Sequence, residues 1–259
     1  MQTAKVIDYI AGWLKAYCDN AGMNGFVAGV SGGIDSAVTS TLCAKTGKPV
    51  IVLNLPIYQA ANQISLAKLH MEWLEKYFPA IQSINIDLTQ AFSSLEKTFP
   101  TEIGDELTMA NTRARLRMLT LYAFSGHNKM LVAGTGNKVE DFGVGFFTKY
   151  GDGGVDISPI ADLMKSEVYK IGRELGIIEG ILNAKPTDGL FNDDRSDEDQ
   201  IGASYDELEW AMGFDADSKD ESRLSDRQKE ALSIYRKFHQ ANQHKMAPVP
   251  VAIIPDLLR

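Results

Sequence analysis

The sequence predicts an α/β fold, an open doubly wound parallel sheet with helices on both faces. Short apolar runs predict strands at residues 26–30, 50–55, 81–86 and 130–133. Helical apolar patterns lie between and after them, at residues 36–45, 62–77, 105–124 and 165–175. Strands and helices that alternate at this spacing are typical of parallel sheets. In such open sheets, ligands bind outside the carboxyl ends of the strands, where the strand order reverses.

Both ends of the chain add helices to this pattern. The first 18 residues carry three charged side chains among their apolar positions, which indicates an amphipathic helix and not the unbroken apolar centre of a signal peptide. Two further helices are expected near residues 199–212 and 226–242. Before them, residues 185–200 form a polar, acidic stretch, and a loop of this length is typical of a mobile cover over a site.

Composition and charge limit the class of protein. With 259 residues, 44% of them apolar, the chain can bury a substantial core, and we expect a single domain over residues 1–259. The net charge of −8 argues against broad binding to nucleic acid or to anionic membranes. No run approaches the roughly 18 apolar residues of a membrane span, so a cytoplasmic protein is expected. Cys18 and Cys43 lack a CxxC spacing and are expected to be small buried residues.

The most specific local signal is FVAGVSGGIDSA at residues 26–37. A buried-type strand runs into two glycines and then a helix, so main-chain N–H groups and the helix dipole can form an anion-binding concavity. Ser31 and Ser36 add hydroxyl donors, and Asp35 can hold Mg²⁺ against phosphates. The segment lacks the lysine of a Walker A loop and the spacing of a dinucleotide-binding fingerprint. It resembles the SGGxDS loop of the PP-loop ATP pyrophosphatases, which release the terminal phosphates of ATP as pyrophosphate.

The second half of the chain narrows the choice among such enzymes. TGNKVE at residues 135–140 and GFFTKYGDGGVD at residues 145–156 closely resemble segments of the NAD synthetase family. The resemblance covers almost the whole chain and continues at residues 111–118, 159–165, 185–187, 204–208 and 244–245. It implies the adenine nucleotide alpha hydrolase-like form of the doubly wound fold, which is Rossmann-like.

The resemblance implies a role for each matching position. ATP would contact Gly29, Val30, Ser31, Gly32, Gly33, Ile34, Asp35, Ser36, Thr135, Lys165 and Thr187. Deamido-NAD⁺ would contact Arg115, Lys149, Asp156, His244 and Lys245. Mg²⁺ would be held by Asp35 and Glu140. The catalytic residues would be Asp35, Lys165 and Asp152, and Asp152 is the candidate for helping ammonia lose a proton.

The family implies a ligase with two chemical steps. The nicotinate carboxylate of deamido-NAD⁺ (nicotinic acid adenine dinucleotide) attacks ATP, releases pyrophosphate and becomes an acyl-adenylate. Ammonia then expels AMP and leaves the amide of NAD⁺. Magnesium and Lys165 would neutralise the departing pyrophosphate.

The nitrogen donor and the partners are also implied. The phosphate loop begins about 30 residues into the chain, so no glutaminase domain is expected in front of it and ammonia is the expected donor, either free or delivered by a separate glutaminase. The family implies a homodimer in which deamido-NAD⁺ lies partly across the interface. The expected partners are therefore small molecules and a second copy of the chain, without nucleic acid or membrane.

Two departures from the family pattern bear on the site. Between Glu140 and Gly145 the chain has one residue more than the pattern, so Asp141 is an alternative metal ligand. Residues 57–63 lack the acidic pattern common there, which leaves the recognition of adenine open.

Other interpretations of single residues stay open. At least one of the three arginines at positions 113, 115 and 117 is expected to be solvated, although Arg115 is the one assigned to the substrate. Phe146 and Phe147 are either core residues or part of the nicotinate pocket, and Lys245 is either a substrate contact or a surface charge.

Three alternative functions are compatible with parts of the same motifs. They are another PP-loop adenylating amidotransferase, a tRNA-modifying enzyme, and a non-catalytic ATP-binding sensor. The acidic composition weighs against tRNA. A sensor would not need Asp35, Glu140 and Lys165 together.

Overall fold

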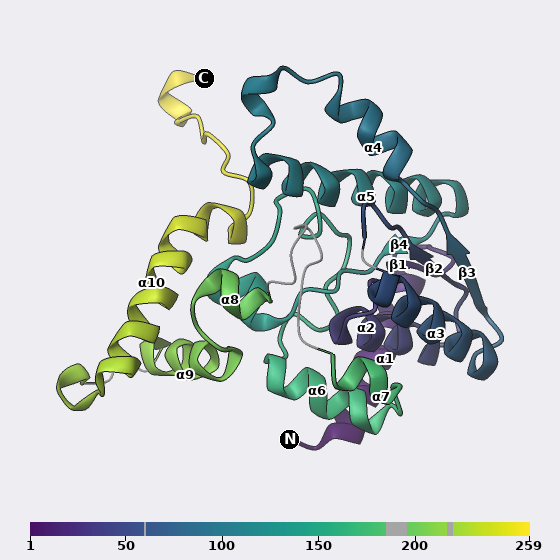
Figure 1. Cartoon of the computed structure of the whole chain (residues 1–259), viewed down its shortest axis with the longest axis horizontal. Helices are drawn as coiled ribbons and strands as arrows, with labels where there is room; N and C mark the ends of the chain where they lie inside the picture. Colours follow the sequence, from purple (N-terminus) through teal and green to yellow (C-terminus); the bar gives the residue numbers. More distant parts are fainter. Residues whose placement is uncertain (60, 185–195, 217–219) are drawn as a thin grey trace.

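The computed structural model describes residues 1–59, 61–184, 196–216 and 220–259. Within them, one parallel sheet has the strand order β3-β2-β1-β4 (Figure 1). The strands are β1 (Phe26–Gly29), β2 (Val50–Asn54), β3 (Ile81–Asn85) and β4 (Leu131–Val132). The chain steps outward from β1 to β3 and then returns to the other side of β1. The strand order therefore reverses between β1 and β4, and a ligand is expected at the carboxyl ends of these two strands.

Helices cover both faces of the sheet, which confirms the predicted doubly wound fold. One layer consists of α1 (Thr3–Asn20), α2 (Ile34–Lys45), α3 (Ala61–Tyr77), α6 (Lys165–Glu174) and α7 (Glu179–Leu182). The other consists of α4 (Thr89–Glu96) and α5 (Glu106–Asn128), and Figure 1 shows α5 running along the side of the sheet opposite α2 and α3. Phe26 and Val52 face the first layer, whereas Val27 and Leu53 face the second. Strands buried on both faces have apolar residues throughout, which explains the continuous apolar runs in the sequence.

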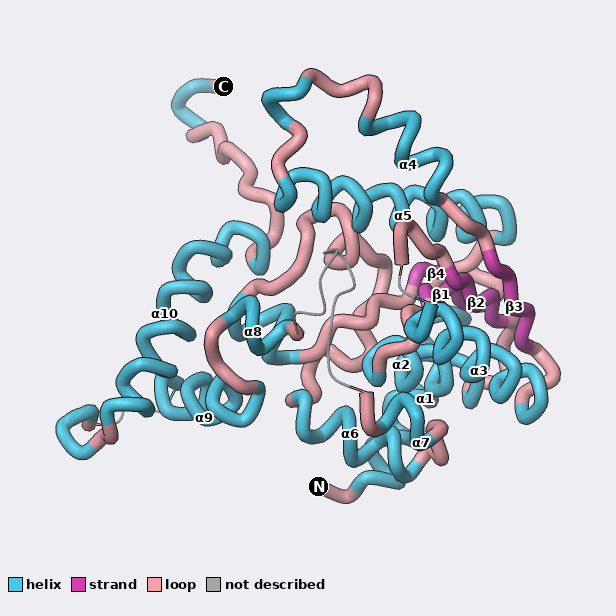
Figure 2. The backbone as a smooth tube through the Cα atoms, in the orientation of Figure 1, coloured by secondary structure: helices cyan, strands magenta, loops and turns pink. Residues whose placement is uncertain are grey.

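A third group of helices packs beside the sheet around a core of its own. It consists of the π-helix η2 (Val139–Val144), α8 (Asp197–Ile201), α9 (Tyr205–Ala216) and α10 (Asp226–Met246). Figure 2 shows α9 and α10 to one side, away from the magenta strands. Short 3₁₀ turns occur at Thr101–Ile103, Glu221–Arg223 and Asp256–Leu258. A helix of sufficient length and apolarity to cross a bilayer does not occur in the described parts of the chain.

The structure corrects several expected boundaries. The helix expected at residues 199–212 is two helices, because Gly202 adopts a left-handed conformation (φ 87°) and ends α8 before α9 begins. Residues 197–200, expected as the end of the covering loop, belong to α8. Helix α4 was not predicted, because Phe92 alone is buried in it and the apolar pattern is correspondingly weak. Other limits agree to within two residues, except that α5, α9 and α10 continue four residues further, to residues 128, 216 and 246.

The π-helix after β4 covers the interval between Glu140 and Gly145, where one residue more than the family pattern is expected. The N–H of Gly145 donates to the carbonyl of Glu140, five residues back, and Gly145 has φ 65°. A π turn holds one residue more than an α turn, and such turns are frequent at functional sites. The wider turn therefore accommodates the additional residue between Glu140 and Gly145.

We predict that Gly145→Ala lowers the free energy of unfolding by about 2–4 kcal/mol, since a left-handed backbone and a steric clash combine. A Cβ atom at this position would lie 2.4 Å from Cβ of Asn242. The matched control is Gly12→Ala in α1, where a Cβ meets no atom within 4 Å and should stabilise the helix by about 0.5–1 kcal/mol. Urea denaturation of both variants measures the difference. Equal midpoints would contradict the assigned backbone conformation.

Candidate active site

The segment between β1 and α2 forms a tight turn that two serine hydroxyls hold together. Gly32 has φ 89°, a conformation that favours glycine. The N–H of Ser31 donates to Ser36 Oγ at 3.2 Å, and the N–H of Gly33 donates to Ser31 Oγ at 3.2 Å. Ser36 Oγ in turn lies 2.9 Å from the carbonyl of Gly33, to which it donates. Because Gly33 is the N-cap of α2, the next main-chain amides lack intrahelical acceptors and can bind an anion.

Several of the other residues predicted to contact ATP lie next to this turn or in the strands beside it. Gly29 is the last residue of β1, and the N–H of Val30 donates to the neighbouring strand β2 at 2.8 Å. Ile34 is buried in the core beneath the turn. Thr135 follows β4, the strand next to β1. Thr187, with the first part of the expected covering loop, lies outside the described residues.

Three charged side chains meet near this turn, although they lie far apart in the sequence. Lys165 Nζ is 2.6 Å from Asp35 Oδ2 and 3.1 Å from Glu140 Oε1. The lysine side chain is 4% exposed, and the two carboxylates are 17% and 16% exposed. Burial raises the pKa of Asp35 in spite of the opposing charge of Lys165. Burial works against the charge of Lys165, but Asp35 and Glu140 hold its pKa above the ordinary value. Two carboxylates against one ammonium leave an excess of negative charge.

Side chains of helix α9 form hydrogen bonds with this cluster and with the start of α6. Tyr205 donates its hydroxyl to Glu140 Oε1 at 2.6 Å, and its ring centre lies 4.5 Å from Lys165 Nζ. Burial and then the charge of Glu140 raise the pKa of Tyr205, so the hydroxyl keeps its proton and acts as the donor. One turn further along α9, Glu209 accepts from the N–H of Ser166 at 2.7 Å and from its hydroxyl at 2.8 Å. These contacts fix the first turn of α6, which carries Lys165.

Two residues that contact the cluster were not predicted as site residues. One is Tyr205, and the other is Asn137, which donates from Nδ2 to Asp35 Oδ1 at 3.1 Å. Both lie in segments that match the family, at residues 135–140 and 204–208. That match was the signal that could have identified them.

Asp141 follows Glu140 and packs against Gly136. A Cβ atom on Gly136 would lie 2.1 Å from Asp141 Oδ1, so the carboxylate fills the space above that glycine. Burial, followed by the charge of Glu140, raises the pKa of Asp141 to about 8. Because Glu140 contacts Lys165 and Asp141 does not, the geometry favours Glu140 as the partner of the lysine.

Four of the residues predicted to bind deamido-NAD⁺ lie close together, where α5, residues 145–150 and the end of α10 meet. Arg115 Nε donates to the carbonyl of Lys149 at 3.2 Å, and Lys149 Nζ donates to the carbonyl of His244 at 3.1 Å. Lys245 Nζ donates to the carbonyl of Phe147 at 2.7 Å and lies 4.8 Å from its ring centre. Lys245 is partly buried, and this burial lowers its pKa, so it is not a fully solvated surface charge.

The remaining predicted residues have other partners. Asp156 accepts from the hydroxyl of Tyr122 at 3.0 Å and from the N–H of Val132 at 2.8 Å, so it is bonded to α5 and β4. Asp152 accepts from the N–H of Thr148 at 3.0 Å. The structure therefore holds Asp156 through contacts separate from those of the four clustered residues.

Three side chains of α10 hold the carbonyls at the end of the π-helix. His239 Nδ1 donates to the carbonyl of residue 143 at 2.7 Å, and Asn242 Nδ2 donates to that of residue 144 at 2.8 Å. Lys245 Nζ donates to the carbonyl of residue 145 at 2.5 Å. Side chains spaced by three residues thus bind successive carbonyls and fix the segment that leads from Glu140 to Lys149.

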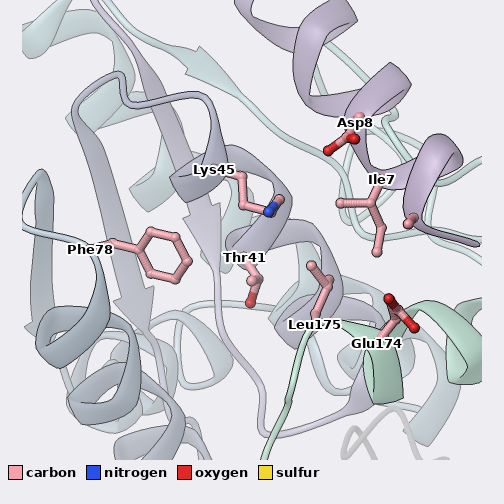
Figure 3. Close-up of a pocket in the computed structure, with 8 residues that line it drawn as sticks. Ile7, Asp8, Thr41, Lys45, Phe78, Glu174 and Leu175 are labelled. Carbon is pink, nitrogen blue, oxygen red and sulfur yellow. The ribbon is translucent and has the colours of Figure 1, made fainter.

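A separate pocket of about 180 Å³ lies between α1, α2 and α6 (Figure 3). It is lined by the charged residues Asp8, Lys45 and Glu174, among others. Lys45 is the last residue of α2, whereas Asp35 lies in its first turn, so the pocket is at the opposite end of that helix from the cluster. We assign it no part in the chemistry.

Comparisons with known proteins agree with the fold and indicate the family. The chain matches the family described as NAD synthase over residues 6–249. It is 34% identical to an NH(3)-dependent NAD(+) synthetase of Methanosarcina acetivorans, over 97% of this chain and 98% of that protein. Its fold is similar to that of an NMN synthetase from Francisella tularensis, with a TM-score of 0.83, 31% identity and 99% of both chains covered. An NH3-dependent NAD synthetase from Campylobacter jejuni gives a TM-score of 0.79 and 25% identity, over 98% of this chain and 100% of that chain.

We predict that Lys165→Met lowers the free energy of unfolding by about 3–5 kcal/mol, because two buried carboxylates lose their cation. Asp35→Asn in the same chain should restore part of the loss. Burial already raises the pKa of Asp35, and removal of the lysine should raise this pKa further. The folded variant then takes up a proton as pH falls, so the loss of stability should become smaller at low pH. Chemical denaturation between pH 5 and pH 8 measures this, and a pH-independent loss would contradict the account.

Proposed function

Because the chain belongs to the NAD synthase family, we propose that it uses ATP to join ammonia to the nicotinate carboxylate of deamido-NAD⁺. The products are NAD⁺, AMP and pyrophosphate. One observation carries the proposal, namely that a glycine turn suited to phosphates lies beside a buried lysine paired with two carboxylates. Adenylation needs this combination, since the departing pyrophosphate has to be bound and its charge neutralised.

The first step makes the acyl-adenylate. A carboxylate oxygen of deamido-NAD⁺ bonds to the α-phosphorus of ATP, and the bond from that phosphorus to the pyrophosphate oxygen breaks. The main-chain amides at residues 31–36 bind the leaving phosphates, and Lys165 supplies the positive charge that a Walker lysine gives elsewhere. Thr135 and Thr187 contact the rest of ATP. Alignment of the two nucleotides contributes several kcal/mol through positioning.

Asp35 and Glu140 are the residues that would hold Mg²⁺. Both carboxylates already contact one cation, Lys165 Nζ, so their oxygens converge on a shared position. This donor set suits Mg²⁺, which is usually bound by one or two carboxylates together with phosphate oxygens and water. When bound, Mg²⁺ neutralises the charge that develops on the pyrophosphate.

The second step makes the amide. Ammonia attacks the acyl carbon, the bond from that carbon to the AMP oxygen breaks, and the nitrogen loses a proton. Asp152 is the proposed acceptor of this proton. Water would destroy the acyl-adenylate, so a cover over the site is proposed to protect it, formed by residues 185–195, which lie outside the described residues.

The dinucleotide is proposed to bind where α5, residues 145–150 and the end of α10 meet. Arg115, Lys149, His244 and Lys245 bring cationic and hydrogen-bonding groups there, which suits a substrate with two phosphates. Asp156 is proposed as a further contact, from its position after β4.

A second candidate substrate is nicotinate mononucleotide, which would give NMN as the product. The similarity to the Francisella tularensis NMN synthetase over 99% of both chains favours this candidate. The two substrates share the nicotinate carboxylate and the adjacent phosphate, so the phosphate turn and the charged cluster serve both. They differ because deamido-NAD⁺ has an adenylate half, which nicotinate mononucleotide lacks.

We also propose that the enzyme is a cytoplasmic homodimer. Helix α5 exposes Leu107, Leu119 and Tyr122, with exposed fractions of 63%, 66% and 38%. Exposed apolar side chains on the helix that also carries Arg115 suit an interface next to the substrate. Sedimentation should give twice the chain mass of 28.5 kDa, and a monomer at micromolar concentration would contradict the dimer.

We predict that the purified protein forms NAD⁺, AMP and pyrophosphate in equal amounts from deamido-NAD⁺, ATP, Mg²⁺ and ammonium. Asp35→Ala should reduce turnover by about 10²–10³, as the loss of a charge-stabilising group typically does. Asp8→Ala, a change of the same type in the remote pocket, should leave turnover unchanged. Formation of ADP and phosphate would exclude adenylation. Glutamine in place of ammonium should give no product.

We predict that deamido-NAD⁺ is preferred over nicotinate mononucleotide by at least about tenfold in kcat/KM, because a second phosphate adds charge-assisted contacts worth about 1.4 kcal/mol or more. Competition between the two substrates, with both amide products separated by chromatography, measures the preference directly. A preference for the mononucleotide would support the second candidate instead.

A further inference from the structure

Asn137 connects the carboxylate of Asp35 to the main chain at Glu140 through a single side-chain amide. It is fully buried (0% exposed) between β4 and the π-helix. Its Oδ1 accepts from the N–H of Val139 at 3.1 Å and from the N–H of Glu140 at 3.2 Å. Its Nδ2 donates to Asp35 Oδ1 at 3.1 Å.

The orientation of this amide follows from its neighbours. Two main-chain N–H donors require an acceptor, so the carbonyl oxygen of Asn137 has to face them. The NH₂ group then points the other way, where Asp35 accepts its hydrogen. Reversal of the amide would place donors against donors on one side and an acceptor against a carboxylate on the other.

One planar group thus fixes both residues. Asp35 is held directly, and Glu140 is held through its main chain at the start of the π-helix. Asp35 uses its other oxygen, Oδ2, for Lys165. An ammonium on a flexible stem attracts carboxylates without a strong preference in direction, whereas an amide hydrogen bond sets direction.

We infer that Asn137 is a positioning residue that holds the carboxylates of Asp35 and Glu140 in the arrangement that the magnesium complex of ATP requires. The inference rests on the proposed function. A neutral donor orients Asp35 and leaves its negative charge available to a cation. A cationic side chain in this place would compete with the metal, and an anionic one would repel Asp35.

Asn137→Asp provides the sharpest test, because it has nearly the same shape. An aspartate still accepts from the two main-chain N–H groups, so the local fold is retained, but its second oxygen faces Asp35 Oδ1 without a hydrogen. Electron paramagnetic resonance measures the affinity for Mn²⁺ in the presence of a non-hydrolysable ATP analogue. This affinity should fall at least about tenfold, which corresponds to about 1.4 kcal/mol. The Mg²⁺ concentration for half-maximal turnover should rise by a similar factor, with kcat lowered and the KM for deamido-NAD⁺ unchanged.

Two further variants separate positioning from stability. Asn137→Ser keeps a short acceptor for the two N–H groups but lacks the reach to Asp35, and it should also weaken Mn²⁺ binding. Ser125→Ala removes another buried hydrogen bond, from Ser125 Oγ to the carbonyl of Met130 at 2.7 Å, in a part of α5 remote from the cluster. It should lower the melting temperature without changing Mn²⁺ binding.

Normal Mn²⁺ binding and a normal Mg²⁺ requirement in a folded Asn137→Asp or Asn137→Ser protein would overturn the inference. That outcome leaves the proposed function intact if the unmodified protein makes NAD⁺. An unmodified protein that binds Mn²⁺ with the ATP analogue but makes no NAD⁺ would instead overturn the proposed function.

Discussion

The buried contact of Lys165 with Asp35 and Glu140 is the interaction on which the site depends. It joins the first turn of α2, the π-helix after β4 and the first turn of α6. Removal of charged groups from water is unfavourable, so this contact is stable only because the surrounding structure holds the lysine and its two partners in place. The reversal of strand order between β1 and β4 supplies that placement, since it brings the ends of two strands with different connections side by side.

The helices beside the sheet complete the site from outside. Tyr205 and Glu209 tie α9 to the cluster and to α6, while α10 binds the carbonyls at the end of the π-helix. The π-helix joins these two sets of contacts, because it carries Glu140 at its start and leads toward the cationic residues near Lys149. The adenylating part and the substrate-binding part of the proposed enzyme are therefore mechanically connected through one short segment.

The sequence predicted the sheet and the glycine turn between β1 and α2 well, because both are local. Apolar runs indicate strands, and two glycines before a helix indicate the turn, independently of the rest of the chain. Contacts such as that of Lys165 with Asp35, 130 residues apart, depend on the topology of the fold. The resemblance to a family indicated these residues, but it did not indicate which of them contact one another. Asn137 and Tyr205 were missed as partners for the same reason. The break at Gly202 depends on a backbone conformation that the apolar pattern does not report.

The central claim is that the phosphates of ATP bind at the turn between β1 and α2, beside the charged cluster. A crystal structure of the protein with Mg²⁺ and a non-hydrolysable ATP analogue tests it most directly. We expect the β- and γ-phosphates on the main-chain amides of residues 31–36, with the metal in contact with Asp35 and Glu140. A triphosphate bound elsewhere, with this turn empty, would contradict the account.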